Sequence, residues 1–155
     1  YYEANILWLR RASTVMARRK KYTKQRKNEH RDPKPVKVPE HLDVVADLEC
    51  GAQLHMQQSA IAGLLEDDSI YLFGSEGTLR LTTDKLFGGQ RGDESLAEIA
   101  IPEHERGGWQ VEADFVAAIR REREVTHTTF ADGLHYMQFT DAVARSLDSS
   151  RAETV

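Results

Sequence analysis

Hydrophobic and polar residues alternate one by one through the middle of the chain, and this period of two predicts β-strands. The clearest case is the stretch 69–82, SIYLFGSEGTLRLT, in which every second residue is aliphatic on both sides of a Gly-Ser-Glu-Gly connection. The two glycines supply the positive-φ positions that a tight connection requires. The stretch therefore predicts a β-hairpin, which needs neighbouring strands and a helical cover to be stable in water.

The same period predicts further strands on both sides of this hairpin. A second hairpin is predicted over 42–57, with its turn at Cys50–Gly51. Single strands are predicted over 12–18 and 97–101, and a short edge strand over 151–155.

Two segments without this period are predicted to be loops. Residues 19–37 are rich in Lys and Arg and are closed by Pro33 and Pro35, so we expect an exposed, mobile loop. The segment Phe87–Gly88–Gly89 is predicted to be a second loop, before the strand over 97–101.

Towards the C-terminus the period becomes that of a helix. Residues 109–124 place aliphatic and aromatic residues on one side and charged residues largely on the other, which predicts an amphipathic helix. A second helix is predicted from Phe130 or Asp132 to about Leu147, with Leu134 among the residues on its buried side.

This order of elements predicts an α+β fold, a largely antiparallel (mixed) open β-sheet with helices packed on one face. A first helix, predicted over 1–9, begins without an N-cap residue, so we expect the chain to continue a longer protein. The other face of the sheet is predicted to be polar and partly aromatic, and to meet either water or another subunit. The residues of that face are Asp43, Asp47, Gln53, His55, Gln57, Tyr71, Phe73 and Arg80.

The composition describes a soluble globular protein of one domain, with 155 residues of which 40% are hydrophobic and 30% charged. No apolar run approaches the roughly 20 residues of a membrane span. Near the N-terminus the positive charges follow the apolar residues, which is the reverse of a secretory signal. The single cysteine, Cys50, excludes an internal disulfide framework and favours a cytoplasmic setting.

The charges are unevenly distributed along the chain. Residues 1–40 contain 12 Lys and Arg against 4 Asp and Glu, whereas residues 41–155 contain 9 against 21. The basic residues gather in 18–27, and three interpretations of that run stay open. It is a solvated loop, a loop that attracts an anionic substrate or a cofactor phosphate, or a nucleic-acid patch. Nucleic acid is the least favoured partner because Tyr22 is the only aromatic residue there.

Few residues have the spacing of a catalytic or metal site. No two of the six histidines form H-x-x-x-H or H-E-x-x-H, so no metal site is predicted. His41 and Asp43 share a strand face, where a solvated or interface pair is expected. Cys50 has no base near it in the sequence. The alternating Asp43, Asp47 and Glu49 fit a polar sheet face better than a pair of catalytic carboxylates.

Four stretches carry a family resemblance, and they follow one another as VPEHLDVVADLECGAQLHMQQS, IYLFGSEGTLRL, FVAAIRR and FADGLHYMQFTDAVARS. In combination they resemble the C-terminal domain of the glucose-fructose oxidoreductase and inositol dehydrogenase (Gfo/Idh/MocA) family, over nearly the whole of 1–155. The resemblance implies hydride transfer between NAD or NADP and a hydroxyl carbon of a sugar, polyol or related metabolite. It also implies that this domain completes the substrate pocket and forms homo-oligomers through its open sheet face.

Most of the catalytic apparatus implied by the resemblance lies outside this chain. The chain has no G-x-G-x-x-G and no Glu-Lys-Pro segment, so the N-terminal Rossmann domain that mainly binds the cofactor is absent from it. Where the family has H-x-x-D on a helix, the chain has Tyr1 to Ala4. The candidates for substrate binding are Tyr1 and Asn5, one helical turn apart, and Arg18 at a strand end. No cofactor-binding residue is identified, and the catalytic residues are unknown.

We therefore expect 1–155 to be the C-terminal substrate-binding and oligomerisation domain of an NAD(P)-dependent oxidoreductase, and to be inactive alone. Two other hypotheses stay open. One is a stand-alone oligomeric binding module whose basic loop, residues 18–27, contacts nucleic acid or another anionic partner. The other is a purely structural assembly domain.

Overall fold

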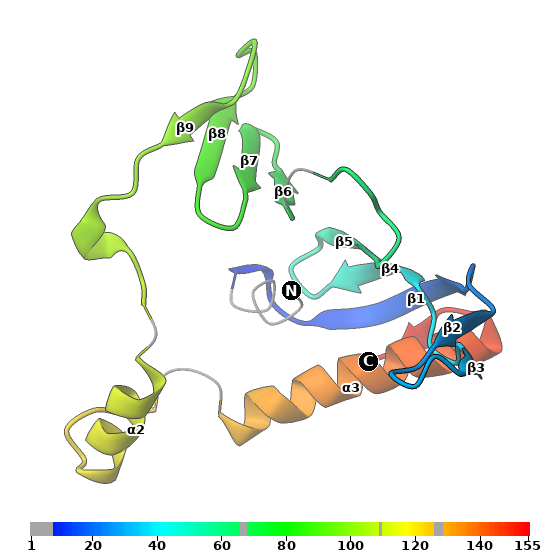
Figure 1. Cartoon of the computed structure of the whole chain (residues 1–155). Coiled ribbons are helices and arrows are strands. Elements are labelled where there is room, and N and C mark those ends of the chain that lie inside the picture. Colours follow the sequence, from blue (N-terminus) through cyan, green and yellow to red (C-terminus); the bar gives the residue numbers. More distant parts are fainter. Residues whose placement is uncertain (1–7, 66–67, 109, 126–128) are drawn as a thin grey trace. The chain divides into compact units, whose positions relative to one another are not determined.

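The computed structural model of the chain describes residues 8–65, 68–108, 110–125 and 129–155 (Figure 1). Two compact units are present, one formed by the chain up to Ala62 together with Arg121–Val155, the other by Gly63–Arg120. Each unit is built on its own four-stranded antiparallel sheet. The predicted α+β class with antiparallel open sheets is confirmed. However, the strands form separate sheets and not the single sheet that was predicted. Strands β5 and β6 follow one another in the chain but do not pair.

The first unit contains a sheet in the order β10-β1-β4-β5 and the long helix α3. Its antiparallel strands are β1 (Ala12–Lys20), β4 (His41–Leu48), β5 (Gln53–Ser59) and β10 (Glu153–Thr154). Helix α3 (Phe130–Ser149) packs along β1. The strands and the hairpin predicted for these regions are confirmed, and β10 is the edge strand that pairs with β1.

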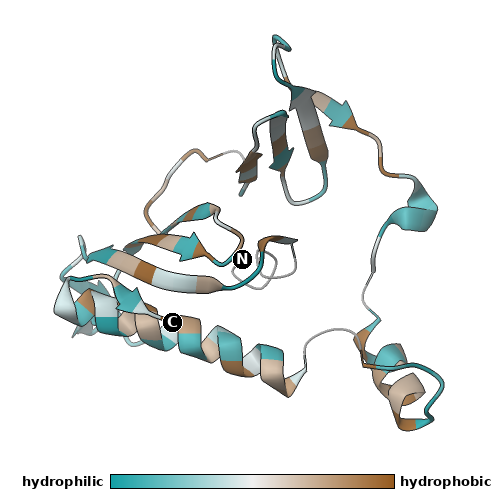
Figure 2. Cartoon of the chain, turned by 180° about the vertical axis from the view of Figure 1, so that it is seen from behind, coloured by the Kyte–Doolittle hydropathy of each residue, from teal (hydrophilic) through white to brown (hydrophobic). Residues whose placement is uncertain are grey.

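One face of this sheet is apolar because alternate residues of β1 and β4 point towards α3. Figure 2 shows hydrophobic and hydrophilic positions also alternating along α3, which gives the helix an apolar side to bury. Several of the core residues are alanines, so the helix can approach the strands closely. The buried core consists of Ala12, Val15, Ala17, Val44, Ala46, Leu48, Phe139, Ala142 and Val143.

Local signals set both ends of α3. At its start the Thr129 hydroxyl accepts a hydrogen bond from the Asp132 N–H (3.2 Å), and the Asp132 carboxylate accepts one from the Thr129 N–H (2.8 Å). This reciprocal pair is a capping box. At its end Ser150 has a φ of 58°, the left-handed conformation that stops a helix. The expectation that Leu134 is buried is wrong, since its side chain is 58% exposed and lies N-terminal to the buried part of α3.

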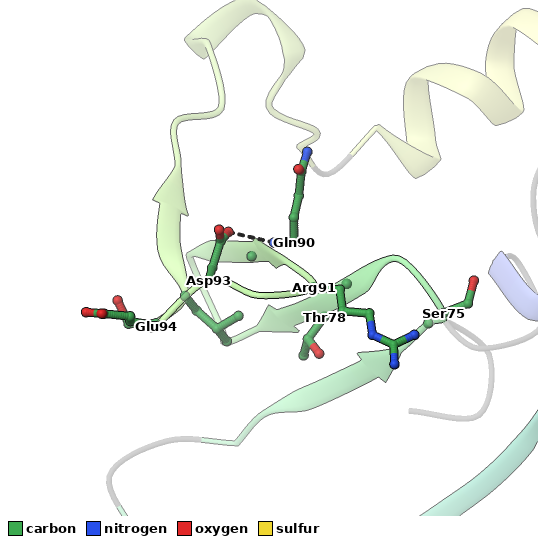
Figure 3. A pocket seen from close by; sticks show the side chains of 11 residues that line it. Ser75, Thr78, Gln90, Arg91, Asp93 and Glu94 are labelled. Atoms are coloured by element: carbon green, nitrogen blue, oxygen red, sulfur yellow. Dashed lines mark hydrogen bonds between the residues drawn. The ribbon is translucent and has the colours of Figure 1, made fainter.

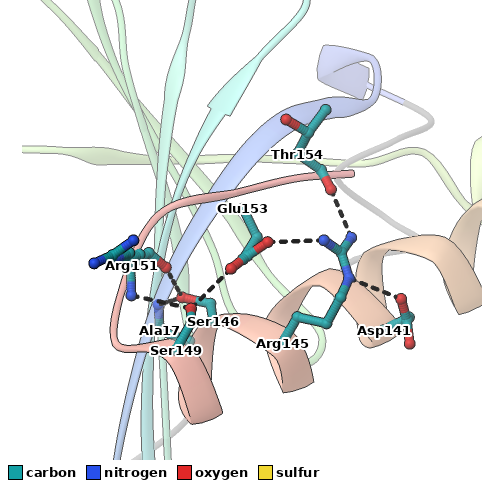
Figure 4. A network of polar contacts seen from close by, with 8 residues as sticks. All are labelled: Ala17, Asp141, Arg145, Ser146, Ser149, Arg151, Glu153 and Thr154. Carbon is teal, nitrogen blue, oxygen red and sulfur yellow. Dashed lines mark hydrogen bonds and ion pairs between the residues drawn. The ribbon is translucent and has the colours of Figure 1, made fainter.

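A buried hydroxyl connects α3 to β1 and to the chain that follows the helix. Ser146 is fully buried, and its Oγ accepts a hydrogen bond from the Ala17 N–H (2.9 Å). The same Oγ donates to the Arg151 carbonyl oxygen at 2.6 Å. In Figure 4 these bonds lie beside the ion pairs that Arg145 makes with Asp141 and with Glu153 of β10. Ser146 therefore joins α3 both to β1, which is distant in the sequence, and to the segment that directly follows the helix.

The expectation that residues 19–37 form a loop is wrong. This segment contains β2 (Gln25–Lys27) and β3 (Pro33–Pro35), which pair as an antiparallel hairpin. In the sequence the hairpin lies between β1 and β4. The side chain of Asn28 accepts a hydrogen bond from the Asp32 N–H, and this bond closes the turn. Proline is tolerated in β3 because this two-stranded ribbon has free edges. We call residues 20–37 the basic hairpin.

The second unit contains four strands that pair in sequence order. They are β6 (Ile70–Phe73), β7 (Gly77–Leu81), β8 (Leu86–Gln90) and β9 (Ala97–Ile99). The predicted β6–β7 hairpin is confirmed, with the Gly74 N–H donating to the Gly77 carbonyl oxygen. The strand predicted over 97–101 is present as the shorter β9. A 3-10 turn η1 (Glu103–Glu105) and helix α2 (Val111–Ile119) follow.

Two expectations for the second unit need correction. The segment Phe87–Gly88–Gly89 is part of β8 and not a loop. Its glycines allow close packing, because a Cβ atom on Gly88 would lie 2.7 Å from the Ile99 side chain of β9, and one on Gly89 would lie 3.1 Å from the Leu96 side chain. The amphipathic helix is confirmed as α2, but it ends at Ile119, since Arg121 adopts a left-handed φ of 60°.

Among the described residues, no helix is long and apolar enough to cross a membrane.

Replacing Ser146 with Ala should destabilise the first unit. The Ala17 N–H would be left buried without an acceptor, which typically costs about 1–3 kcal/mol. The control is Ser149→Ala, which removes an exposed hydroxyl of the same helix that bonds Glu153. Urea unfolding followed by circular dichroism measures both variants. Equal losses of stability in the two would contradict the structural role of Ser146.

Candidate functional site

The face of sheet β10-β1-β4-β5 that points away from α3 is the strongest candidate for a functional surface. Strand pairing arranges its residues in four rows across the sheet, from one end of the strands to the other. These rows are Thr14–Asp47–Gln53, Met16–Val45–His55, Arg18–Asp43–Gln57 and Lys20–His41–Ser59. The five residues of the predicted open face that belong to this sheet, Asp43, Asp47, Gln53, His55 and Gln57, therefore do share one face.

A cluster of polar side chains lies on this face. The Asp43 carboxylate is bonded through one oxygen to His41 Nε2 (3.0 Å) and through the other to Gln57 Nε2 (3.2 Å). Asp47 accepts a hydrogen bond from the Thr14 hydroxyl at 2.9 Å. These carboxylates are thus held by neighbours on the same sheet, which fits a structured contact surface better than a pair of catalytic carboxylates across a cleft.

The middle row of this face is the least polar. Met16 is 41% exposed and Val45 is 38% exposed, although both lie in the two central strands of the sheet. An apolar centre surrounded by polar residues is the usual anatomy of a protein–protein interface.

Only one predicted substrate-binding residue can be placed. Tyr1 and Asn5 lie outside the described residues. Arg18 lies on the open face, directly opposite Asp43 in the strand register, and its side chain is exposed. The structure therefore does not bring the three residues together in a described site.

The basic hairpin is anchored by one buried carboxylate, Glu40. Its side chain is 3% exposed and accepts hydrogen bonds from the Tyr22 N–H (2.9 Å) and the Thr23 N–H (2.6 Å). It also forms an ion pair with Arg26 on β2 at 2.5 Å. The backbone of Glu40 bonds to Lys20 at the end of β1. Sequence reasoning missed Glu40, because no local pattern distinguishes it from the other acidic residues.

The environment of Glu40 changes its pKa. Hydrogen bonds from Thr23, together with those from Tyr22 and Arg26, lower the pKa from 4.5 to about 2, in spite of the opposing effect of burial. The carboxylate is therefore charged at all physiological pH values. Because its bonds reach the backbone at the base of the hairpin, Glu40 orders a segment whose Lys and Arg side chains are exposed.

The second unit presents its own polar and aromatic face. The rings of Tyr71 and Phe73 stack at 5.6 Å between centroids, and the Arg80 guanidinium lies 4.3 Å from the centre of the Phe87 ring. Register places Tyr71, Arg80 and Phe87 in one row, so the face predicted from alternation is present here too. Among the described residues, the buried Nε of Arg80 has no hydrogen-bond partner.

A shallow pocket of about 530 Å³ lies at one end of the second sheet. It is lined by the β6–β7 turn, the end of β8 and the loop that follows β8. In Figure 3 the side chains of Gln90, Arg91 and Glu94 point away from one another. Asp93 is used locally, since its carboxylate accepts a hydrogen bond from the Gln90 N–H. The pocket therefore lacks the convergent polar groups of a ligand site.

Two further residues considered from the sequence, Cys50 and His135, lie in a turn and in a helix. Cys50 is exposed in the β4–β5 turn. His135 bonds to Gln138 within α3. In the part of the chain that the structure describes, no three His, Cys, Asp or Glu residues are grouped as metal ligands.

Comparison with known proteins identifies the fold. No family model matches the chain, and no curated protein matches it by sequence. A levoglucosan dehydrogenase in complex with NADH matches with a TM-score of 0.81 and 18% identity, over 99% of this chain and 47% of that chain. An NAD binding oxidoreductase from Klebsiella pneumoniae matches with a TM-score of 0.82 and 17% identity, over 99% and 47%. An oxidoreductase from Agrobacterium radiobacter, in complex with NAD+, L-tartaric acid and magnesium, matches with a TM-score of 0.70 and 16% identity, over 97% and 45%.

These matches confirm, at the level of the fold, the resemblance to the C-terminal domain of Gfo/Idh/MocA-like oxidoreductases. Two of them extend over nearly the entire chain. The chain spans about half the length of the solved structures that it matches.

Replacing Glu40 with Gln should destabilise the protein at neutral pH by removing the charge that anchors the hairpin. Because the pKa of Glu40 is lowered on folding, its contribution is complete above its unfolded pKa of 4.5 and is lost as the pH falls through about 2. The difference in stability between wild type and variant should therefore shrink over that range. Unfolding curves at several pH values measure it, with Glu49→Gln in the exposed turn as control. A difference that does not change with pH would contradict this role.

Proposed function

We propose that this chain is the C-terminal, substrate-binding and oligomerisation domain of an NAD- or NADP-dependent oxidoreductase. In this proposal the whole enzyme transfers hydride between the nicotinamide and a hydroxyl carbon of a sugar, polyol or related hydroxy metabolite. The observation that carries the proposal is the match of 99% of this chain to 47% of a levoglucosan dehydrogenase whose structure contains NADH. Nearly all of this chain thus corresponds to half of such an enzyme.

In this proposal, the residues of this chain indicate that the cofactor is bound mainly by another domain. It contains no G-x-G-x-x-G, so its own residues do not form a dinucleotide fingerprint. The nicotinamide, when bound, supplies the hydride chemistry, and it would be held mainly by a Rossmann domain outside this chain. By itself the chain is expected to be inactive. A reducing, cytoplasmic setting is proposed from its single cysteine.

In this proposal, homo-oligomers form through the open face of sheet β10-β1-β4-β5. One face of the sheet is covered by α3, whereas the other exposes Met16 and Val45 in its two central strands. Arg18 lies on this open face, so it would contact a substrate only where another subunit or domain covers it.

The first test is the coding sequence immediately upstream of Tyr1, together with cofactor binding by the complete encoded protein. We expect that sequence to encode a strand followed by G-x-G-x-x-G and a later Glu-Lys-Pro. Nicotinamide fluorescence should then show saturable binding of NADH or NADPH. Residues 1–155 expressed alone are the control and should not bind either cofactor. An upstream sequence without these motifs, or a complete protein that binds neither cofactor, would refute the proposed function.

A further inference from the structure

We propose that the basic hairpin binds double-stranded DNA by lying in the major groove, with its lysines on the phosphates of both strands. The hairpin contacts the sugar-phosphate backbone and does not depend on the base sequence. This role is separate from the proposed oxidoreductase function and does not rest on it.

The hairpin concentrates positive charge in a chain that is otherwise acidic. Residues 20–37 contain eight Lys and Arg against two Asp and Glu, whereas the rest of the chain contains 13 against 23. Positive charge that gathers in one segment, and not in the whole chain, is typical of a segment that binds a polyanion.

Most of these charges are available to a partner. Glu40, the buried carboxylate at the base of the hairpin, pairs with Arg26. The hairpin's own acidic residues, Glu29 and Asp32, lie at its turn. Six lysines remain, all exposed, and within the described part of the chain none of them forms an ion pair. They are Lys20, Lys21, Lys24, Lys27, Lys34 and Lys37.

Backbone hydrogen bonds order the hairpin from its base to its turn. The Glu40 N–H donates to the Lys20 carbonyl oxygen, and the Val36 N–H donates to the Lys24 carbonyl oxygen. The pairing of β2 with β3 follows, and the Asn28 N–H then closes the ladder at the turn. An ordered segment loses less conformational entropy on binding than the mobile loop expected from the sequence would lose.

The cations lie on both faces of this ribbon. Arg26 and Lys34 are directly opposite each other in the register, so they share one face. Lys27, the next residue along β2, points to the other face. A flat partner, such as a membrane or a protein surface, meets only one of these faces. A groove between two phosphate backbones meets both.

The dimensions of a two-stranded ribbon suit the major groove of DNA. Paired strands lie about 4.8 Å apart, and the groove is about 12 Å wide. The major groove of an RNA duplex is deep and narrow, and side chains cannot read it. Tyr22 is the only aromatic residue of the hairpin, which disfavours stacking on single-stranded bases. Phosphate contacts in a duplex do not need such stacking.

The hairpin lies at the end of β1 that is remote in the sequence from the predicted substrate-binding residues. It follows Lys20, whereas Tyr1 and Asn5 precede Ala12, where the strand begins (Figure 1). The strand separates its own two ends by about 26 Å. This position favours a partner of its own for the hairpin over a role in holding the substrate of the same chain.

The experiment measures the binding of the complete encoded protein to a short fluorescent DNA duplex of arbitrary sequence. Fluorescence anisotropy gives the association constant at several salt concentrations between about 50 and 200 mM. If the six lysines contact phosphates, the logarithm of this constant should fall against the logarithm of the salt concentration with a slope of about −5. The absence of saturable binding at about 50 mM salt would overturn the proposal.

A hairpin variant combines Lys24→Glu, Lys27→Glu and Lys34→Glu. These side chains are exposed and make no ion pair within the described residues, so the fold should be retained, and circular dichroism checks this. We expect binding to DNA to weaken by about tenfold or more at about 100 mM salt, and the slope to become shallower by about three.

The matched control combines Arg91→Glu, Arg120→Glu and Arg121→Glu. It changes the net charge of the protein equally, but at exposed positions of the second unit and of the residue that follows it. The control should weaken binding by less than about twofold, because salt screens charges that do not contact the DNA. Equal losses in the two variants would show that only net charge matters, and would refute a binding role for the hairpin.

Competition identifies the partner. Unlabelled duplex DNA should displace the probe at a lower phosphate concentration than duplex RNA or single-stranded DNA of the same sequence. If duplex RNA competes equally well, binding in the major groove is refuted. If poly-glutamate competes equally well at the same charge concentration, the hairpin recognises acidic protein segments, and the proposal fails. Cofactor binding is measured separately, so the oxidoreductase assignment does not depend on these results.

Discussion

The packing of α3 against β1 and β4 is the contact on which the first unit depends. It joins the end of the chain to its beginning, through the buried core and through the Ala17 N–H bond to Ser146 Oγ. Because small residues such as Ala17 and Ala142 lie at this contact, the helix approaches the strands closely. The helix also determines which face of the sheet is buried, since it covers one face and leaves the other open. Both the core and the candidate surface follow from this one contact.

Much of the fold could be predicted because strand and helix periods are local properties of the sequence. The alternation in 42–57 indicated both β4 and β5 and the residues of their open face, and the register confirms them. The hairpin within 19–37 could not be predicted, because its order comes from Glu40, which lies outside the segment and bonds its backbone. The strand at Phe87–Gly88–Gly89 was missed for a similar reason, since the space beside its glycines is occupied by Leu79 of β7 and by Leu96 and Ile99, which are distant in the sequence or follow the strand.

The candidate site was harder to predict than the fold. Polar residues on an alternating strand indicate a face, but the sequence does not show which partners hold them. The structure shows that Asp43 is held by His41 and Gln57 on the same sheet face. It also gives the face a direction, from Lys20 at one end to Asp47 at the other. The function proposed for the whole protein depends on a cofactor-binding domain outside this chain. The comparison of folds is the observation that links this chain to that function.

The measurement that tests the central claim most directly is the change in nicotinamide absorbance when the complete encoded protein is mixed with NAD or NADP and a panel of sugars and polyols. The account predicts that at least one compound causes a steady, enzyme-dependent increase in reduced nicotinamide, and that residues 1–155 alone cause none. No reduction of either cofactor with any member of a broad panel, by a protein shown to be folded, would contradict the account.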